Sequence, residues 1–447
     1  MIGNDPVGVE IKKGVSIFQF DFLIFLSMLL LMTIGALFIY SSGVNSEGQI
    51  ISVEYRYQLV WIGTALLIYF LFQIPHYQIL QKYSFRIYAV SILVMIGTLL
   101  FGKEVNGARS WLGFFGFGIQ PSEFMKMALI LMLASFYQYR SKEIDTFSTF
   151  IFGLLITLLP MVLVLLQPDM GTALVYIPVF LAVSYIAGVH RRYLLYFFLL
   201  GLLTILFAVI PVWEHFILQR DIRFISVFNE PRLMFFTSGI FFVTGSLSLI
   251  SNKITKRGYF FNIGMILLLF SFSLIASYFF RSFLKDYQIM RLIVFIKPDI
   301  DPRGSGWNII QSMTAVGSGG FWGKGFLHGT QSHYQFLPQQ STDFIFSIIA
   351  EEWGFAGSIL VIALFGIILI RGFVILLNAG DDFAVYVGTG ILFMLFFHMV
   401  INIGMATGIM PITGIPLFFL SYGGSSLWTA TIGLSLLQNI YLRRYKY

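Results

Sequence analysis

Charged residues and cysteine are scarce in this 447-residue sequence. Asp, Glu, Lys and Arg make up 11% of the chain, while hydrophobic residues make up 57%. So few charges cannot cover so much apolar surface in water, which excludes a soluble enzyme and separate soluble domains. The chain has no cysteine. This excludes disulfides, a thiol nucleophile, Cys-ligated metal sites and iron–sulfur clusters, and it disfavours redox chemistry.

Several motifs of soluble enzymes are also absent. The sequence contains no P-loop lysine motif, no dinucleotide-binding fingerprint, no HExxH and no GxSxG nucleophile elbow. We therefore do not expect ATP hydrolysis within this chain.

Long apolar tracts take the place of these features. A membrane-crossing helix needs about 20 predominantly apolar residues. The first tract is too long for a signal-peptide core and is not followed by a small-residue cleavage site, so we interpret it as a retained helix. We predict an all-α, polytopic integral membrane bundle of about 12 transmembrane helices. The tracts are 22–40, 58–74, 86–102, 122–138, 148–166, 170–188, 193–212, 233–250, 259–280, 343–370, 383–408 and 415–440.

The basic residues predict the orientation. With a cytoplasmic amino terminus, fifteen of the 28 basic residues fall in cytoplasmic segments, which satisfies the positive-inside rule. Both termini are then expected in the cytoplasm. The basic turn SNKITKRG (251–258) supports two crossings around it. The fifteen are Lys12, Lys13, Lys82, Arg86, Arg140, Lys142, Arg191, Arg192, Lys253, Lys256, Arg257, Arg371, Arg443, Arg444 and Lys446.

One hydrophilic stretch, 281–342, is far longer than the other loops. It follows the ninth predicted crossing and is therefore expected to face outward, where it is the default functional region. Apolar and aromatic residues recur in it, as in GWNIIQSMTAVGSGGFWGKGF (306–326). This pattern favours a folded or re-entrant segment packed on the bundle over a disordered connector.

Ionisable residues inside apolar tracts cost roughly 2.5–3.5 kcal/mol each, so they usually face a partner or a cavity. Glu123 and Lys126 are three residues apart at the start of the fourth helix and can pair. Either a structural ion pair or a substrate-binding role is consistent with this spacing. Asp169 follows Pro168 in the expected first turn of a helix, where a carboxylate is favoured as a cap or as part of a site.

Asp343 lies at the mouth of the tenth helix, after Ser341 and Thr342, with Glu351 and Glu352 two turns deeper. From the pattern alone Asp343 is either an N-terminal cap or a functional acid.

Two further features lie near the carboxyl end. His398 and Asn402 are spaced i and i+4 in the eleventh helix, which favours interhelical hydrogen bonds over a ligand set. The run PITGIPLFFLSYGGSS (411–426) has two prolines and three glycines and predicts irregular backbone at membrane depth. Such backbone is tolerated only where it is buried in protein or lines a wet cavity.

Seven ordered motifs together resemble the SEDS family of shape, elongation, division and sporulation proteins. The resemblance covers nearly the whole chain and is greatest to the elongation member, with the division-specific polymerase as the alternative. The motifs are NGARSW (106–111), QPSEFMK (120–126), QPDMGTA (167–173), DPRGSGWNIIQS (301–312), GSGGFWGKGF (317–326), FLPQQSTDFIFSIIAEEWGFAG (336–357) and PITGIPLFFLSYGGSS (411–426).

The resemblance implies a peptidoglycan glycosyltransferase that polymerises lipid II on the outer face of the bacterial cytoplasmic membrane. It also implies a class B penicillin-binding protein, other elongation-complex membrane proteins and membrane lipids as partners, and no nucleic acid. Many members have His where this chain has Ser341. The family commonly has ten crossings, so within a single SEDS domain (1–447) we expect 233–280 to be an inserted helix pair.

The implied catalytic residue is Asp343, in the TDFIF motif, as the general base. Transfer with one base would invert the anomeric centre and release undecaprenyl diphosphate, which needs basic side chains or a divalent cation, Mg²⁺ or Mn²⁺. No metal ligands are assigned, and any one basic residue could instead anchor anionic lipid headgroups. The substrate-binding or diphosphate-binding candidates are Arg109, Glu123, Lys126, Asp169, Arg291, Arg303, Lys324, Thr342 and Ser425.

The residues are also consistent with two other classes of function. A lipid II flippase or transporter could use buried charges as a path, although we see no inverted repeat of the kind that many transporters carry. A non-catalytic membrane scaffold would not depend on Asp343.

Overall fold

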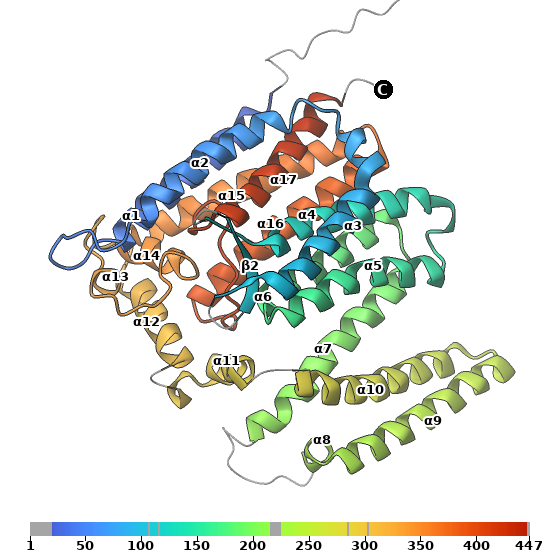
Figure 1. Ribbon diagram of the computed structural model, residues 1–447. Helices are drawn as coiled ribbons and strands as arrows, with labels where there is room; N and C mark the ends of the chain where they lie inside the picture. Colours follow the sequence, from blue (N-terminus) through green and yellow to red (C-terminus); the bar gives the residue numbers. More distant parts are fainter. Residues whose placement is uncertain are drawn as a thin grey trace, which may run out of the picture.

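The computed structural model describes residues 20–105, 108–114, 117–214, 225–283, 286–301 and 304–444. Most of them form helices gathered in one bundle (Figure 1). Each of the twelve predicted tracts corresponds to a helix of at least 18 residues. These are α1 (Phe22–Ser42), α2 (Glu54–Leu71), α3 (Tyr77–Phe101), α4 (Pro121–Tyr139), α5 (Phe147–Leu166), α6 (Met170–Ala187), α7 (Arg191–Trp213), α9 (Pro231–Thr255), α10 (Gly258–Phe283), α15 (Gly354–Leu377), α16 (Asp382–Ala406) and α17 (Gly424–Leu442).

Within the described ranges, nine of these helices are long and apolar enough to cross a membrane by length and composition. The other three, α2, α4 and α17, are long enough but less apolar. The predicted fold class, a polytopic helical membrane protein, is confirmed. The number of crossings stays a prediction.

The long stretch 281–342 is folded where the structure describes it. It contains the end of α10 and several short elements, and it leads into a short helix that precedes the tenth crossing. These elements are α11 (Asp286–Ile296), the 3₁₀ turn Pro298–Ile300, α12 (Ser305–Ser318), α13 (Thr330–His333) and then α14 (Ile345–Glu352).

The tenth predicted tract starts too early. Residue 343 lies in a turn, and α14 and α15 are separate helices that meet at Trp353. Gly354 adopts a left-handed φ of +65°, which a residue with a side chain rarely adopts. The candidate membrane span is therefore α15, and Asp343 lies outside it.

A small antiparallel sheet was not predicted. It connects α3 to α4 and consists of β1 (Lys103–Val105), β2 (Ala108–Phe114) and β3 (Phe117–Ile119). Its strands are too short and too rich in glycine to give a clear alternating pattern. The ring of Trp111 covers Gly118, where a Cβ would lie 2.9 Å from the indole.

The main hydrophobic core is shared by most of the bundle helices. It is centred on α16, which contacts α4, α6, α15 and α17 and is buried along most of its length. Residues 411–423, between α16 and α17, contain no regular helix, as predicted from their prolines and glycines.

The α9–α10 pair projects away from this bundle together with the end of α7 (Figure 1). The short helix α8 (Ser226–Asn229) packs against α7 and α9. The two long helices approach closely at Gly245 and Gly264, and the hydroxyls of Ser238 and Ser271 lie 2.9 Å apart. The pair has a small hydrophobic cluster of its own with α7 and α8.

Candidate active site

The irregular segment 411–423 is held by two side chains of α16. Asn402 donates a hydrogen bond from Nδ2 to the carbonyl of Ile415 (2.8 Å), and Nδ1 of His398 lies 2.9 Å from the carbonyl of Pro416. Carbonyls without a helical partner are therefore satisfied by side chains, as buried backbone requires. The pair was predicted to make interhelical hydrogen bonds, but the bonds named here go to the irregular backbone that follows α16.

The segment that carries Asp343 is hydrogen-bonded to α16 and to the irregular segment 411–423. The other proton of the Asn402 amide goes to the carbonyl of Asp343 (2.9 Å). Ser421 donates from Oγ to the carbonyl of Thr342 (2.5 Å), and the Tyr422 N–H donates to the carbonyl of Ser341 (2.8 Å). Hydrogen bonds to the carbonyls of residues 341–343 thus fix the backbone position from which the Asp343 side chain extends.

Asp343 is not a helix cap. The N-cap position of α14 belongs to Phe344, and no side chain caps that helix. The Asp343 carboxylate is therefore not used to satisfy the backbone of α14. Of the two roles that the sequence left open, the structure excludes the cap.

The Asp343 carboxylate and the Arg291 guanidinium of α11 face the same glycine. Gly414 has a left-handed φ of +72°, and a Cβ on it would lie 3.6 Å from Oδ2 of Asp343 and 3.9 Å from Nη1 of Arg291. The carboxylate and the guanidinium therefore both lie close to the backbone at Gly414. An acid and a positive charge that are close to the same glycine can serve a reaction that moves a proton and displaces an anion.

The environment of Asp343 changes its acidity. Burial raises the pKa of this carboxyl above its ordinary 3.8. The positive charge of Arg291 and a hydrogen bond with Thr342 lower the pKa, and the negative charge of Asp169 raises it. A raised pKa makes a carboxylate a better proton acceptor near neutral pH.

Asp169 caps α6 and also links two motifs of the site. Its carboxylate accepts hydrogen bonds from the Thr172 N–H (3.0 Å), the Thr172 hydroxyl (2.8 Å) and Nε2 of Gln120 (2.9 Å). The Gln120 N–H in turn donates to Oγ of Ser425 (3.0 Å). The helix begins at Met170, one residue after the acid, so Asp169 is the N-cap rather than part of the first turn.

A second glycine brings α6 against the irregular segment. A Cβ on Gly171 would lie 2.5 Å from the carbonyl oxygen of Thr413, so only glycine allows this approach. The neighbour of Thr413 is Gly414, which borders Asp343. The start of α6 therefore sets the position of one wall of the site.

Glu123 and Lys126 form the predicted ion pair, with Oε1 and Nζ 2.7 Å apart. Both side chains are almost fully buried, at 3% and 1% exposure. Nζ of Lys126 lies 3.1 Å from Nε2 of His398, whose ring stacks on Phe418 at 3.8 Å between centroids. This geometry favours the structural role over contact with substrate.

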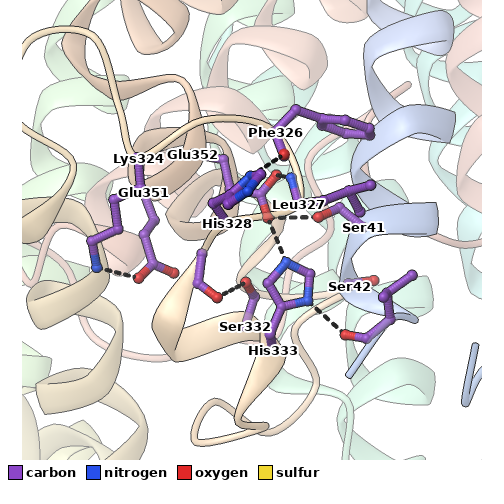
Figure 2. A network of polar contacts seen from close by, with 12 residues as sticks. Ser41, Ser42, Lys324, Phe326, Leu327, His328, Ser332, His333, Glu351 and Glu352 are labelled. Atoms are coloured by element: carbon purple, nitrogen blue, oxygen red, sulfur yellow. Dashed lines mark hydrogen bonds and ion pairs between the residues drawn. The ribbon is translucent and has the colours of Figure 1, made fainter. Parts of the chain in front are cut away.

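Glu351 holds the loop that precedes Asp343 (Figure 2). Its carboxylate is fully buried. Oε1 accepts hydrogen bonds from Nζ of Lys324 (2.7 Å), the Thr330 N–H (2.8 Å) and the Gln331 N–H (3.0 Å). Lys324, a diphosphate-binding candidate from the sequence, is therefore engaged in an ion pair.

Glu352 ties the same loop to α1. It is also fully buried, and it accepts hydrogen bonds from Oγ of Ser41 (2.5 Å) and the Leu327 N–H (3.0 Å). Nε2 of His333 lies 3.4 Å from its carboxylate, and Nδ1 of His333 lies 2.7 Å from the carbonyl of Val44 (Figure 2). The acid raises the pKa of the His333 imidazole. We call Glu351 and Glu352 with these partners the carboxylate clamp.

Of the two remaining basic candidates, one is largely exposed and the other lies outside the described residues. Arg109 lies on β2 with more than half of its side chain exposed, 3.6 Å from Glu104. Arg303 lies outside the part of the chain that the structure describes. Of the predicted residues, the structure brings Asp343, Thr342, Arg291, Asp169 and Ser425 together around 411–423.

Sequence reasoning missed several residues of this arrangement. Gln120 is the first residue of one QP dipeptide and Gly171 closely follows the other, while Gly414 and Ser421 lie in the run already identified as irregular. The repeated QP dipeptide was an available signal, because each precedes or begins a helix at the same end of the bundle. The role of these dipeptides depends on tertiary contacts, which a local sequence pattern does not predict.

These features define a class, namely integral membrane proteins with a partly buried acid beside an arginine at one end of a helical bundle. Residues 21–253 and 237–446 match the FtsW/RodA/SpoVE family of cell cycle proteins, and the chain belongs to this family. The predicted family is confirmed.

Curated relatives match almost the full chain. The chain is 46% identical to the peptidoglycan glycosyltransferase RodA of Treponema pallidum, over 97% of this chain and 99% of that protein. It is 30% identical to stage V sporulation protein E of Bacillus subtilis, over 94% and 96% of the two chains. It is also 30% identical to the peptidoglycan glycosyltransferase MrdB of Escherichia coli, over 93% of each chain.

Solved structures share the fold. One is a chain of the complex described as "Structural coordination of polymerization and crosslinking by a peptidoglycan synthase complex", with a TM-score of 0.63, 25% identity and coverage of 96% of this chain and 99% of that chain. The rod shape determining protein RodA of Thermus thermophilus has a TM-score of 0.58 at 24% identity, covering 95% and 98%.

Proposed function

We propose that this chain polymerises lipid II into glycan strands at the outer face of the bacterial cytoplasmic membrane, with Asp343 as the general base. The chain is a peptidoglycan glycosyltransferase, the activity named for two of its relatives, and the predicted enzyme class is confirmed. The observation that carries the catalytic assignment is that the carboxylate of Asp343 and the guanidinium of Arg291 both lie close to Gly414.

The proposed reaction is a single displacement. The hydroxyl oxygen of the acceptor sugar forms a bond to the anomeric carbon of the donor, the bond from that carbon to the diphosphate oxygen breaks, and Asp343 takes the hydroxyl proton. General base catalysis of this kind contributes typically 10²–10⁴-fold. One displacement inverts the anomeric centre.

Arg291 is the cation best placed for the leaving diphosphate. Guanidinium groups bind phosphate oxygens through paired, charge-assisted hydrogen bonds, and developing negative charge is stabilised where water is excluded. Lys126 and Lys324 are engaged with Glu123 and Glu351. Arg109 and Arg303 remain proposed contacts for the substrate.

A divalent cation, Mg²⁺ or Mn²⁺, is a further proposal. Among the described residues, no group of three or more His, Asp or Glu side chains could hold a metal ion. The oxygens of Asp169 already accept hydrogen bonds from Thr172 and Gln120. The described side chains therefore do not fit a site made by protein alone, and we derive no catalytic step from a cation. Mg²⁺ usually takes one or two carboxylates together with substrate phosphates.

The orientation of the chain is also proposed. The site elements gather at one end of the bundle. The opposite end holds other polar contacts, including the ion pair of Arg371 with Asp21 (2.6 Å) and the hydrogen bond from the Tyr77 hydroxyl to Asp381 (2.9 Å). With cytoplasmic termini, the site would face outward, where lipid II is polymerised.

We infer a class B penicillin-binding protein as partner, together with other membrane proteins of cell elongation. The solved complex that matches this fold is described as coordinating polymerization and crosslinking, which supports such a pairing. Lipid II and the surrounding membrane lipids complete the expected partners.

The pair α9–α10 is proposed to be a lineage insertion in the single domain. The two pieces of the family match overlap inside α9, and the pair packs on α7 and α8 rather than on the site. The segment 281–342 that follows is proposed to lie outside the membrane on the same side as Asp343.

A reconstituted assay tests the polymerase against the flippase alternative. Purified protein in detergent and in liposomes receives labelled lipid II, and glycan strands and translocation are measured separately. We expect strands from the wild type and none from Asp343→Ala, with unchanged thermal unfolding. Translocation without polymerisation, or strands from a folded Asp343→Ala protein, would reject the proposal.

A further inference from the structure

Three aromatic side chains form an exposed cluster on the segment that precedes Asp343. Trp307 lies near the start of α12, and Tyr334 and Phe336 follow α13. These residues are 38%, 58% and 43% exposed. The rings of Tyr334 and Phe336 are stacked with centroids 5.8 Å apart, and Trp307 meets Phe336 edge to face at 6.5 Å. We call these three residues the aromatic platform.

The platform is held in a defined shape. Nε1 of Trp307 donates a hydrogen bond to the carbonyl of Phe336 (2.7 Å), which joins α12 to the loop. The Tyr334 N–H donates to the carbonyl of Thr330 (3.2 Å), and Gln335, between the two stacked rings, adopts a left-handed φ of +57°. Exposed rings fixed in this way can bind a ligand without a large loss of side-chain entropy.

A small hydrophobic core joins the chain segments that carry the platform and the catalytic site. Its members come from α11, α12, the loop, the start of α14 and the irregular segment. Each lies within three residues of either the platform or the group formed by Arg291, Asp343 and Gly414. They are Val294, Ile309, Leu337, Phe344 and Ile412, and Met405 of α16 belongs to the same core. The segments that carry the platform and the catalytic residues therefore share one hydrophobic core.

A second exposed aromatic cluster serves as a contrast. Phe321 packs on Trp322 (4.9 Å between centroids) and on Phe355 (5.8 Å), and Trp322 is 79% exposed. Phe355 is in the first turn of α15, a candidate membrane span. Aromatic residues at the ends of membrane helices are typical anchors at the lipid interface. None of the platform residues belongs to a candidate span.

We propose that the aromatic platform binds the sugar backbone of the glycan strand next to the catalytic site. The inference rests on the proposed polymerase function and names a binding site for its polymer. The C–H faces of pyranose rings are apolar and pack on aromatic rings, while the hydroxyl of Tyr334 and neighbouring backbone groups can meet sugar hydroxyls. The segments that carry the platform and Asp343 share one hydrophobic core. A glycan strand that leaves or enters the site would therefore pass over the platform.

Binding without turnover tests this directly. The probe is a lipid-free glycan strand of alternating N-acetylglucosamine and N-acetylmuramic acid, titrated by calorimetry into the full-length protein in detergent. We expect Tyr334→Ala and Phe336→Ala each to weaken binding at least fivefold, and Tyr334→Phe to restore it to within twofold of the wild type. Trp322→Ala, the matched control from the other cluster, should bind like the wild type.

The length of the products gives a second readout. With lipid II as substrate, we expect strands from Tyr334→Ala to be several-fold shorter than strands from the wild type and from Trp322→Ala. Thermal unfolding confirms that each variant is folded. Unchanged glycan binding in Tyr334→Ala and Phe336→Ala would overturn the proposal, as would an equal loss in Trp322→Ala.

Other ligands give distinct results. If the variants bind the glycan normally but bind less to phosphatidylglycerol vesicles, or less to a class B penicillin-binding protein, the platform is a lipid or protein contact and the proposal is wrong. Failure of the polymerase proposal is recognised separately, because a protein without polymerase activity can still be titrated with the glycan.

Discussion

The site end of the bundle and the α9–α10 pair use different means to stay folded. At the site end, irregular backbone is held by buried side chains such as Asn402, Ser421 and Glu352. The α9–α10 pair consists of two regular helices joined by a close glycine contact and the Ser238–Ser271 hydrogen bonds. A helix forms the hydrogen bonds of its own backbone N–H and C=O groups. Irregular segments in a membrane protein need hydrogen-bond partners from other parts of the chain.

This difference indicates where function resides. A site needs backbone in shapes that a helix cannot provide, so buried polar groups gather around it. The described part of the pair brings no residue to Asp343 and needs few such groups. Substitutions of buried polar residues should therefore be costly around the site, and changes in α9–α10 should be tolerated.

The largest loss of stability is expected from Glu123→Ala. This change leaves the Lys126 ammonium buried beside the His398 ring and the Phe418 ring with no acidic partner in its ion pair, and removing one partner of a buried pair costs about 3–5 kcal/mol. Thermal unfolding in detergent measures the effect. The matched control is Glu143→Ala, which breaks the exposed pair with Arg140 and should cost less than about 1 kcal/mol. Equal losses in both variants would contradict the buried, structural role.

A smaller loss is expected from Gly171→Ala. The new Cβ would collide with the carbonyl of Thr413 and push residues 411–415 away from α6, at about 1–3 kcal/mol. Polymerase activity should fall because Gly414 borders Asp343. Gly201→Ala on α7 is the control, since no atom lies within 4 Å of the added Cβ. Full activity of a folded Gly171→Ala protein would show that this wall of the site tolerates displacement.

The carboxylate clamp should make stability depend on pH. Because the folded protein raises the pKa of His333, its contribution is fully present below the unfolded value of 6.5 and is lost as pH rises through the folded pKa. The melting temperature should therefore fall more between pH 6 and pH 8 in the wild type than in His333→Gln. Parallel curves for the two proteins would exclude this contribution.

The smallest effect on the reaction is expected from removing residues 233–280. The described contacts of α9 and α10 are with α7, α8 and each other, so the bundle and the residues around Asp343 should keep their arrangement. Glycan synthesis by the deletion protein, compared with the full chain at equal amounts of folded protein, measures this. Loss of all activity in a well-folded deletion protein would show that the pair is part of the catalytic unit.

Much of this architecture follows from the sequence because its signals are local. The apolar tracts predicted the long helices, the spacing of Glu123 and Lys126 predicted their pair, and the prolines and glycines of 411–426 predicted irregular backbone. The short sheet at Arg109 was missed because its strands give no clear alternation. The engagement of Lys324 by Glu351 and the approach of Arg291 to Asp343 were also missed, because both join segments that are distant in the sequence.

The catalytic role of Asp343 is tested most directly by replacing its carboxylate with an amide of the same shape. Asp343→Asn and the wild type are compared for strand synthesis from lipid II, with thermal unfolding measured on the same samples. We predict a rate at least 10²-fold lower and a melting temperature near that of the wild type, because the amide cannot accept the hydroxyl proton. A folded Asp343→Asn protein that polymerises at more than half the wild-type rate would contradict the assignment.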